Sequence, residues 1–174
     1  MIEQAPFKVG GYFEVECYDK KGDLKWSEVA KNLVPADGLD HILDVVLHGA
    51  TQITTWYVVP FENDHSPATS DSYATPGFTE CTAYDEANRV EYNEAAADGQ
   101  SITNSANKAS FTINATKTIY GAALVGGGTN PSVKGNATSG GVLLCEAQFT
   151  SSKSVEDDDT LEVTYTISAA DDGA

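Results

Sequence analysis

The residue types most often used in catalysis are few and widely spaced in this chain. The histidines are His41, His48 and His65. His41 and His48 are seven residues apart, and the chain has no H-E-x-x-H zinc motif. No G-x-S-x-G sequence is present to expose a nucleophilic serine. We therefore expect the histidines to lie at the surface or at a helix end, and not to act in catalysis.

Two further motifs could bind a ligand, either a Ca²⁺ ion or a phosphate group. Asp157-Asp158-Asp159 offers oxygen ligands to Ca²⁺, but it lacks the D-x-D-x-D-G spacing of a calcium loop, so a solvated charge cluster at a turn is favoured. The glycine run 126–128 follows an expected strand without the Lys-Ser/Thr or the G-x-G-x-x-G pattern of a phosphate cradle. The sequence thus predicts no catalytic, cofactor-binding or metal-binding residues, and no enzyme.

The three cysteines, Cys17, Cys81 and Cys145, are far apart and show no C-x-x-C spacing. An odd number at such separations indicates neither a zinc site nor a disulfide framework. Cys17 and Cys145 fall on the apolar phase of expected strands, so we expect both to be buried as small hydrophobic side chains. The pattern around Cys81 leaves its place open.

Charge narrows the classes of partner. The chain of 174 residues carries 26 acidic and 10 basic residues, a net charge of −16. Nucleic-acid binding requires a basic surface, and an anionic membrane attracts one, so neither partner is expected. The acidity fits a solubilising surface, the exposed surface of a particle, or a basic protein partner.

The hydropathy of the sequence indicates neither a membrane-spanning segment nor a signal peptide. No stretch approaches the roughly 18 apolar residues that span a bilayer, and the first residues show no apolar core of a signal peptide. We expect a single domain made in the cytoplasm of the expressing cell.

Alternation of apolar and polar residues dominates the rest of the chain and predicts β-strands. The clearest cases are residues 10–19, with Phe13, Val15 and Cys17 in one phase, and residues 160–168. The other expected strands are 24–30, 54–61, 88–93, 101–103, 109–114, 118–125 and 141–150. The fold class expected is mainly β: a jelly-roll-like β-sandwich of about eight strands with one α-helix at about residues 37–48. The strand order is not predicted.

The sequence also predicts a central hairpin and one helix. The strands at 109–114 and 118–125 are separated by the short polar sequence Asn114-Ala115-Thr116, which predicts a central hairpin. The helix should begin near Asp37 as its N-cap and end at Gly49. Its apolar stripe should cover a face or an edge of a sheet. The stripe consists of Leu39, Ile42, Leu43, Val46 and Leu47.

The remaining segments are expected to be peripheral. Residues 62–79 read as a long surface loop and 126–141 as a flexible one. The domain plan is an N-terminal arm at 1–9, one β domain at 10–168 and an acidic tail at 169–174.

Several motifs resemble a family of tailed-bacteriophage structural proteins, the capsid cement or decoration proteins. The first third carries E-C-Y-D-x-x-G-x-L-K-W at 16–26, Asn32-Leu33-Val34, Gly38-Leu39 with Leu43, and Trp56-Tyr57. The later matches are Phe78-Thr79-Glu80, Tyr84-Asp85-Glu86-Ala87, Arg89, Lys108-Ala109-Ser110-Phe111, Ile113-Asn114-Ala115, Ile119-Tyr120-Gly121-Ala122, Leu161 and Val163-Thr164-Tyr165. The resemblance covers most of residues 11–168.

The resemblance implies a jelly-roll protein that binds the major capsid protein on the outer surface of the virion and stabilises the head against the pressure of packaged DNA. It implies homodimers or homotrimers, no cofactor and no catalysis. The N-terminal arm, through Pro6, Phe7 and Val9, and the long loops are the expected partner contacts. The alternative is a head-fibre or tail-fibre module that binds a host receptor or glycan, which exposed aromatic residues in the two long loops would favour.

Overall fold

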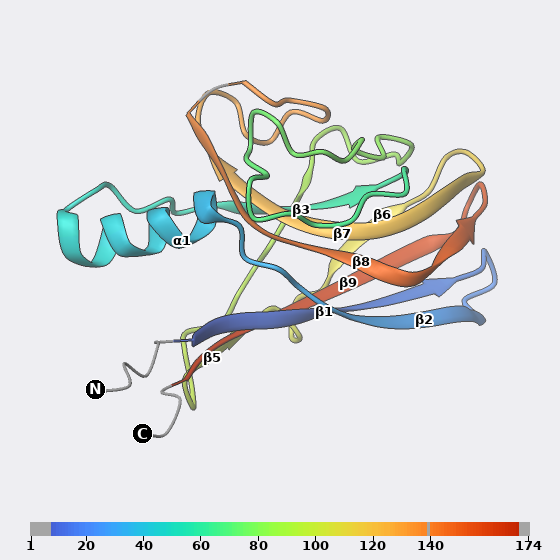
Figure 1. The fold of residues 1–174 in the computed structure, drawn as a ribbon. Coiled ribbons are helices and arrows are strands. Elements are labelled where there is room, and N and C mark those ends of the chain that lie inside the picture. The colour runs from blue at the N-terminus through green and yellow to red at the C-terminus, as the bar shows by residue number, and fades with distance from the viewer. Residues whose placement is uncertain (1–7, 139, 171–174) are drawn as a thin grey trace.

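The computed structural model describes residues 8–138 and 140–170, and within them the chain forms a two-layer β-sandwich of antiparallel sheets (Figure 1). The predicted sandwich with one helical segment is confirmed. The described strands are β1 (Lys8–Tyr18), β2 (Leu24–Lys31), β3 (Trp56–Phe61), β4 (Val90–Glu91), β5 (Ser101–Thr103), β6 (Ala109–Thr112), β7 (Lys117–Gly127), β8 (Gly141–Val155) and β9 (Thr160–Ala170).

The first sheet has the order β2-β1-β9-β5, and β6 also pairs with β9. β1 and β9 are antiparallel over their whole length, from Lys8 opposite Ala170 to Tyr18 opposite Thr160. Lys8 and Val9, expected in the arm, and Ala169 and Ala170, expected in the tail, therefore belong to strands. Since the period-two pattern places alternate residues on one face, both strands direct their apolar side chains into the sandwich.

The second sheet has the order β4-β3-β7-β8. Between the sheets lies a core that includes Phe13, Phe111 and Tyr165, each with 0% of its surface exposed. The rings of Phe13 and Tyr165 stack with their centres 4.4 Å apart. All three cysteines are buried, which confirms the prediction for Cys17 and Cys145 and places Cys81 in the core as well.

The predicted central hairpin is wrong. β6 pairs with β9 in the first sheet, whereas β7 pairs with β3 and β8 in the second. After β6, Ile113 forms an isolated bridge with Tyr84 and its amide donates to the Asp159 carbonyl. The polar sequence at 114–116 therefore carries the chain from one sheet to the other.

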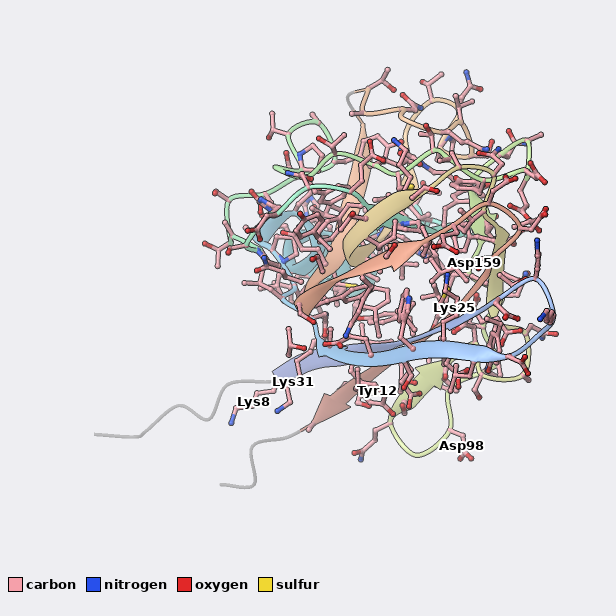
Figure 2. All side chains as sticks on the ribbon, turned by 90° about the vertical axis from the view of Figure 1, so that its right-hand side faces the viewer. Lys8, Tyr12, Lys25, Lys31, Asp98 and Asp159 are labelled. Carbon is pink, nitrogen blue, oxygen red and sulfur yellow. The ribbon has the colours of Figure 1, made fainter. Side chains whose placement is uncertain are left out.

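The acidic turn between β8 and β9 is not uniformly solvated. Asp159 is 2% exposed, and its carboxylate accepts hydrogen bonds from the Lys25 ammonium at 2.6 Å and the Glu156 amide at 2.7 Å (Figure 2). Asp157 and Asp158 are exposed. The expectation of a solvated cluster thus fails at Asp159, which joins this turn to β2 as a structural anchor.

The helical segment consists of α1 (Ala36–Leu43) followed by a π-helical turn, η1 (Asp44–His48). Gly49 ends it in the left-handed conformation, as predicted. The N-cap is Pro35 and not Asp37. Asp37 lies in the first turn, where its carboxylate accepts hydrogen bonds from the amides of Tyr73 and Leu143.

None of the helices in the described part of the chain has the length and apolar content that crossing a membrane requires.

Candidate functional site

The apolar stripe of the helical segment is mostly exposed, contrary to the prediction that it covers a sheet. Figure 1 shows the helix extending away from the two sheets. Of the five stripe residues, Ile42 packs against the core. The other four, which we call the helix face, are Leu39 (42% exposed), Leu43 (52%), Val46 (72%) and Leu47 (79%). Adjacent exposed apolar residues of this size are typical of a protein-binding surface.

An apolar groove lies between the helix and the sandwich. It has a volume of about 390 Å³ and is lined by Ile42 and Val46 from the helix, and by Trp56, Leu144 and Ile167 from three strands. The His41 ring stands edge-on to Trp56, with the ring centres 5.7 Å apart. The helix face and this groove form one continuous apolar region through Val46.

The base of the helix is firmly attached to the sandwich. Gly38 is buried so closely against the Leu144 carbonyl that a Cβ atom at position 38 would collide with it. The Asp37 carboxylate is 2.8 Å from the Leu143 amide, and the Ala36 amide donates to the Thr69 carbonyl. The helix face is therefore held in a defined orientation, which lowers the entropic cost of binding a partner.

The partner contacts expected from the sequence are only partly described. Pro6 and Phe7 lie outside the described residues. Val9 lies in β1 opposite Ala169 and is partly exposed. Lys8 at the start of β1 pairs with Ala170 at the end of β9. Figure 1 shows these ends of β1 and β9 on the same side of the molecule as the helix. Val9 and the helix face thus belong to the same end of the molecule.

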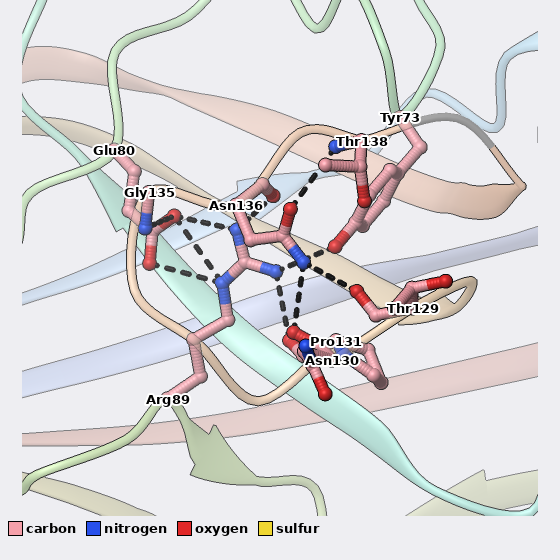
Figure 3. Close-up of polar contacts among 9 residues, drawn as sticks. All are labelled: Tyr73, Glu80, Arg89, Thr129, Asn130, Pro131, Gly135, Asn136 and Thr138. Carbon is pink, nitrogen blue, oxygen red and sulfur yellow. Dashed lines mark hydrogen bonds and ion pairs between the residues drawn. The ribbon is translucent and has the colours of Figure 1, made fainter.

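The loop between β7 and β8 is organised by a buried arginine, where the sequence predicted a flexible loop. Figure 3 shows the Arg89 guanidinium at the centre of the polar contacts. It donates to Glu80 at 2.7 Å, to the Tyr73 hydroxyl at 3.0 Å, and to the loop carbonyls of Pro131 and Asn136 at 2.8 and 2.6 Å. Glu80 also accepts from the Gly135 amide.

Arg89 and Glu80 form a buried ion pair, with 2.7 Å between the guanidinium nitrogen and the carboxylate oxygen. Burial by itself lowers the pKa of the Arg89 guanidinium, but the hydrogen bonds and charge of Glu80 outweigh it and raise that pKa above its ordinary value. The side chains of Arg89 and Glu80 are 4% and 7% exposed. With its donors already bonded to the protein, Arg89 is a structural anchor for the loop and not a free binding group.

A second buried polar cluster joins residues 62–79 to β8. The His65 Nε2 atom is 2.9 Å from Asp71 Oδ2 and 3.5 Å from Glu146 Oε2. Burial raises the pKa of the Glu146 carboxyl to about 8, and the neighbouring Asp71 adds to this effect. His65 was expected at the surface, but its side chain is only 14% exposed. His65 and Glu146 are 81 residues apart, so no motif in the sequence indicates that they meet.

The long loops do not offer the aromatic surface that would favour a receptor-binding fibre. In residues 62–79, Tyr73 is buried and Phe78 is partly buried against the Phe61 ring. The segment 126–141 contains no aromatic residue. The apolar region at the helix is therefore the better candidate for an interaction site.

No protein-family model matches the chain, and no curated protein is found to match it.

Proposed function

We propose that the chain is a bacteriophage capsid cement protein, which binds the outer surface of the major capsid protein lattice and stabilises the head against internal DNA pressure. The observation that carries the proposal is the exposed helix face, which gives a strongly acidic β-sandwich a surface suited to binding another protein. The motifs that resemble tailed-phage cement proteins support the same role.

Charge favours the capsid protein over a second copy of the chain as the occupant of the helix face. Asp40 and Asp44 are exposed on the same helical segment, and the chain as a whole carries a net charge of −16. Two copies joined through this face would bring like charges together, which costs binding energy. A capsid surface with basic residues around an apolar patch would complement it. A homodimer or homotrimer remains the expected oligomer, through contacts elsewhere on the sandwich.

The mechanism is binding linkage. A protein that binds the assembled lattice, and not its free subunits, stabilises the lattice by mass action. No chemical step is required. A rigid two-sheet sandwich serves this role because its binding surface is already ordered before it meets the capsid.

The test is a binding comparison of two matched variants on undecorated heads of the phage that encodes the chain. Leu43→Glu places a charge on the helix face. Leu24→Glu places one in β2, on a leucine of nearly the same exposure, 55% for Leu24 and 52% for Leu43. A charge buried at the centre of an interface costs at least about 2 kcal/mol, so Leu43→Glu should weaken binding about thirtyfold or more. Leu24→Glu should bind like the unaltered protein.

Both leucines are exposed, so neither variant should change the free energy of unfolding by more than about 0.5 kcal/mol. Equal binding of the two variants to heads would exclude the helix face as the contact. Absence of binding by the unaltered protein would overturn the cement function itself. Binding of only a few copies per head would favour the fibre alternative.

A further inference from the structure

The cluster of His65, Asp71 and Glu146 has the composition and the spacing of a metal site. One ligand atom from each residue, an imidazole nitrogen or a carboxylate oxygen, lies within 4.8 Å of the other two. Two ligands bound tetrahedrally to Zn²⁺, each about 2.1 Å from the ion, are about 3.4 Å apart. The distance from His65 Nε2 to Glu146, 3.5 Å, is close to that value, whereas the 2.9 Å to Asp71 is a hydrogen bond that an ion would replace.

The second observation is that the Glu146 carboxylate accepts no hydrogen bond from the described residues, and the group can hydrogen-bond to Asp71 only if it keeps its proton. Its side chain is completely buried, and neither of its carboxylate oxygens meets a donor among the described residues. A buried carboxyl group without a donor is costly unless it keeps its proton or binds a cation. Its Oε2 atom faces the imidazole nitrogen of His65, so the unsatisfied group points into the cluster.

The surroundings hold the ligands in place. Gly77 packs so closely on the His65 ring that a Cβ atom at position 77 would collide with the imidazole. The Ala68 amide donates a hydrogen bond to the Asp71 carboxylate. The backbone amides and carbonyls of Glu146 and Leu33 form two hydrogen bonds with each other. The three side chains are thus positioned by separate parts of the fold before any ion arrives, as a selective metal site requires.

We propose that His65, Asp71 and Glu146 bind one divalent transition-metal ion, of which Zn²⁺ is the best match. A ligand set of one imidazole and two carboxylates is borderline in softness and suits Zn²⁺ better than Ca²⁺ or Mg²⁺, which require more oxygen ligands. Three protein ligands would leave the fourth tetrahedral position of the ion to a water molecule. This inference does not depend on the proposed function.

The consequence for the fold is a cross-link between residues 65–71 and β8. The same segment supports the base of the helix, since the Thr69 carbonyl accepts from the Ala36 amide and the Tyr73 amide donates to Asp37. An ion in the cluster would therefore stabilise the loop and the attachment of the helix together.

The test is calorimetric titration of the chelator-treated full chain with Zn²⁺, and separately with Ca²⁺, together with thermal unfolding. We expect one Zn²⁺ per chain, no comparable binding of Ca²⁺, and a melting temperature raised by about 5–10 °C at a hundredfold excess over Kd. Glu146→Gln should remain folded, because the amide has the shape of the uncharged carboxyl. Its affinity for Zn²⁺ should be at least tenfold lower.

His65→Gln is a second variant that removes a ligand, and His48→Gln, which alters an exposed histidine on the helix, is the matched control. His65→Gln should lose Zn²⁺ binding, and His48→Gln should bind Zn²⁺ like the unaltered chain. The proposal is overturned if the unaltered chain binds no Zn²⁺, in which case Glu146 keeps its proton beside Asp71. It is also overturned if both ligand variants bind Zn²⁺ normally, or if His48→Gln abolishes binding.

Discussion

Arg89→Ala is expected to lower the free energy of unfolding by about 3–5 kcal/mol, because it leaves the Glu80 carboxylate buried without its counter-charge. The guanidinium also donates hydrogen bonds to the carbonyls of Pro131 and Asn136 and to the hydroxyl of Tyr73, and these acceptors would lose their donor. Urea unfolding of the two proteins, compared by midpoint at constant slope, measures the loss.

Two further variants separate the role of Arg89 from a general effect of charge. Lys20→Ala removes an exposed cation and should change stability by no more than about 0.5 kcal/mol. Glu80→Gln combined with Arg89→Ala should be more stable than Arg89→Ala alone, since the double variant buries no unpaired carboxylate. A loss below about 1 kcal/mol in Arg89→Ala would show that the guanidinium does not organise the loop.

Phe111→Ala should cost about 3–5 kcal/mol of unfolding free energy, since it leaves a cavity between the sheets. The Phe111 side chain is fully buried in β6, and its ring meets the Tyr84 ring edge-on with the centres 5.0 Å apart. Thermal or urea unfolding measures the effect. Leu24→Ala, which shortens an exposed side chain in β2, is the control and should lie within about 0.5 kcal/mol of the unaltered protein.

The same residue shows how far the sequence predicts this fold. The alternation around Phe111 correctly indicates a strand and the face that is buried, because a period of two is a local property. The partner of that strand is not a local property. β6 bonds to β9, 50 residues further along, and not to the strand that follows it, so the short polar sequence at 114–116 was misread as a hairpin turn.

The helix shows a related limit. The spacing of Leu39, Leu43 and Val46 predicts one apolar side, and the structure has it. Burial of that side within the same chain was an added assumption. It is wrong because the base of the helix is anchored, with Gly38 against Leu144, while the rest of the helix extends away from the sheets. An apolar stripe therefore identifies a surface that needs a partner, but not which partner.

The polar clusters were beyond reach of the sequence for the same reason. Arg89 meets Pro131 and Asn136, and His65 meets Glu146, because the strands of the second sheet bring segments that are distant in sequence together. No spacing along the chain relates these residues. By contrast, Cys17 and Cys145 were placed correctly because their burial follows directly from strand phase.

The most direct test of the cement function is the thermal stability of DNA-filled heads that lack the protein, measured with and without the purified chain. The account predicts saturable binding at a copy number comparable to that of the capsid protein, and release of DNA at a higher temperature once the sites are filled. Heads that neither bind the chain nor change their release temperature would contradict it.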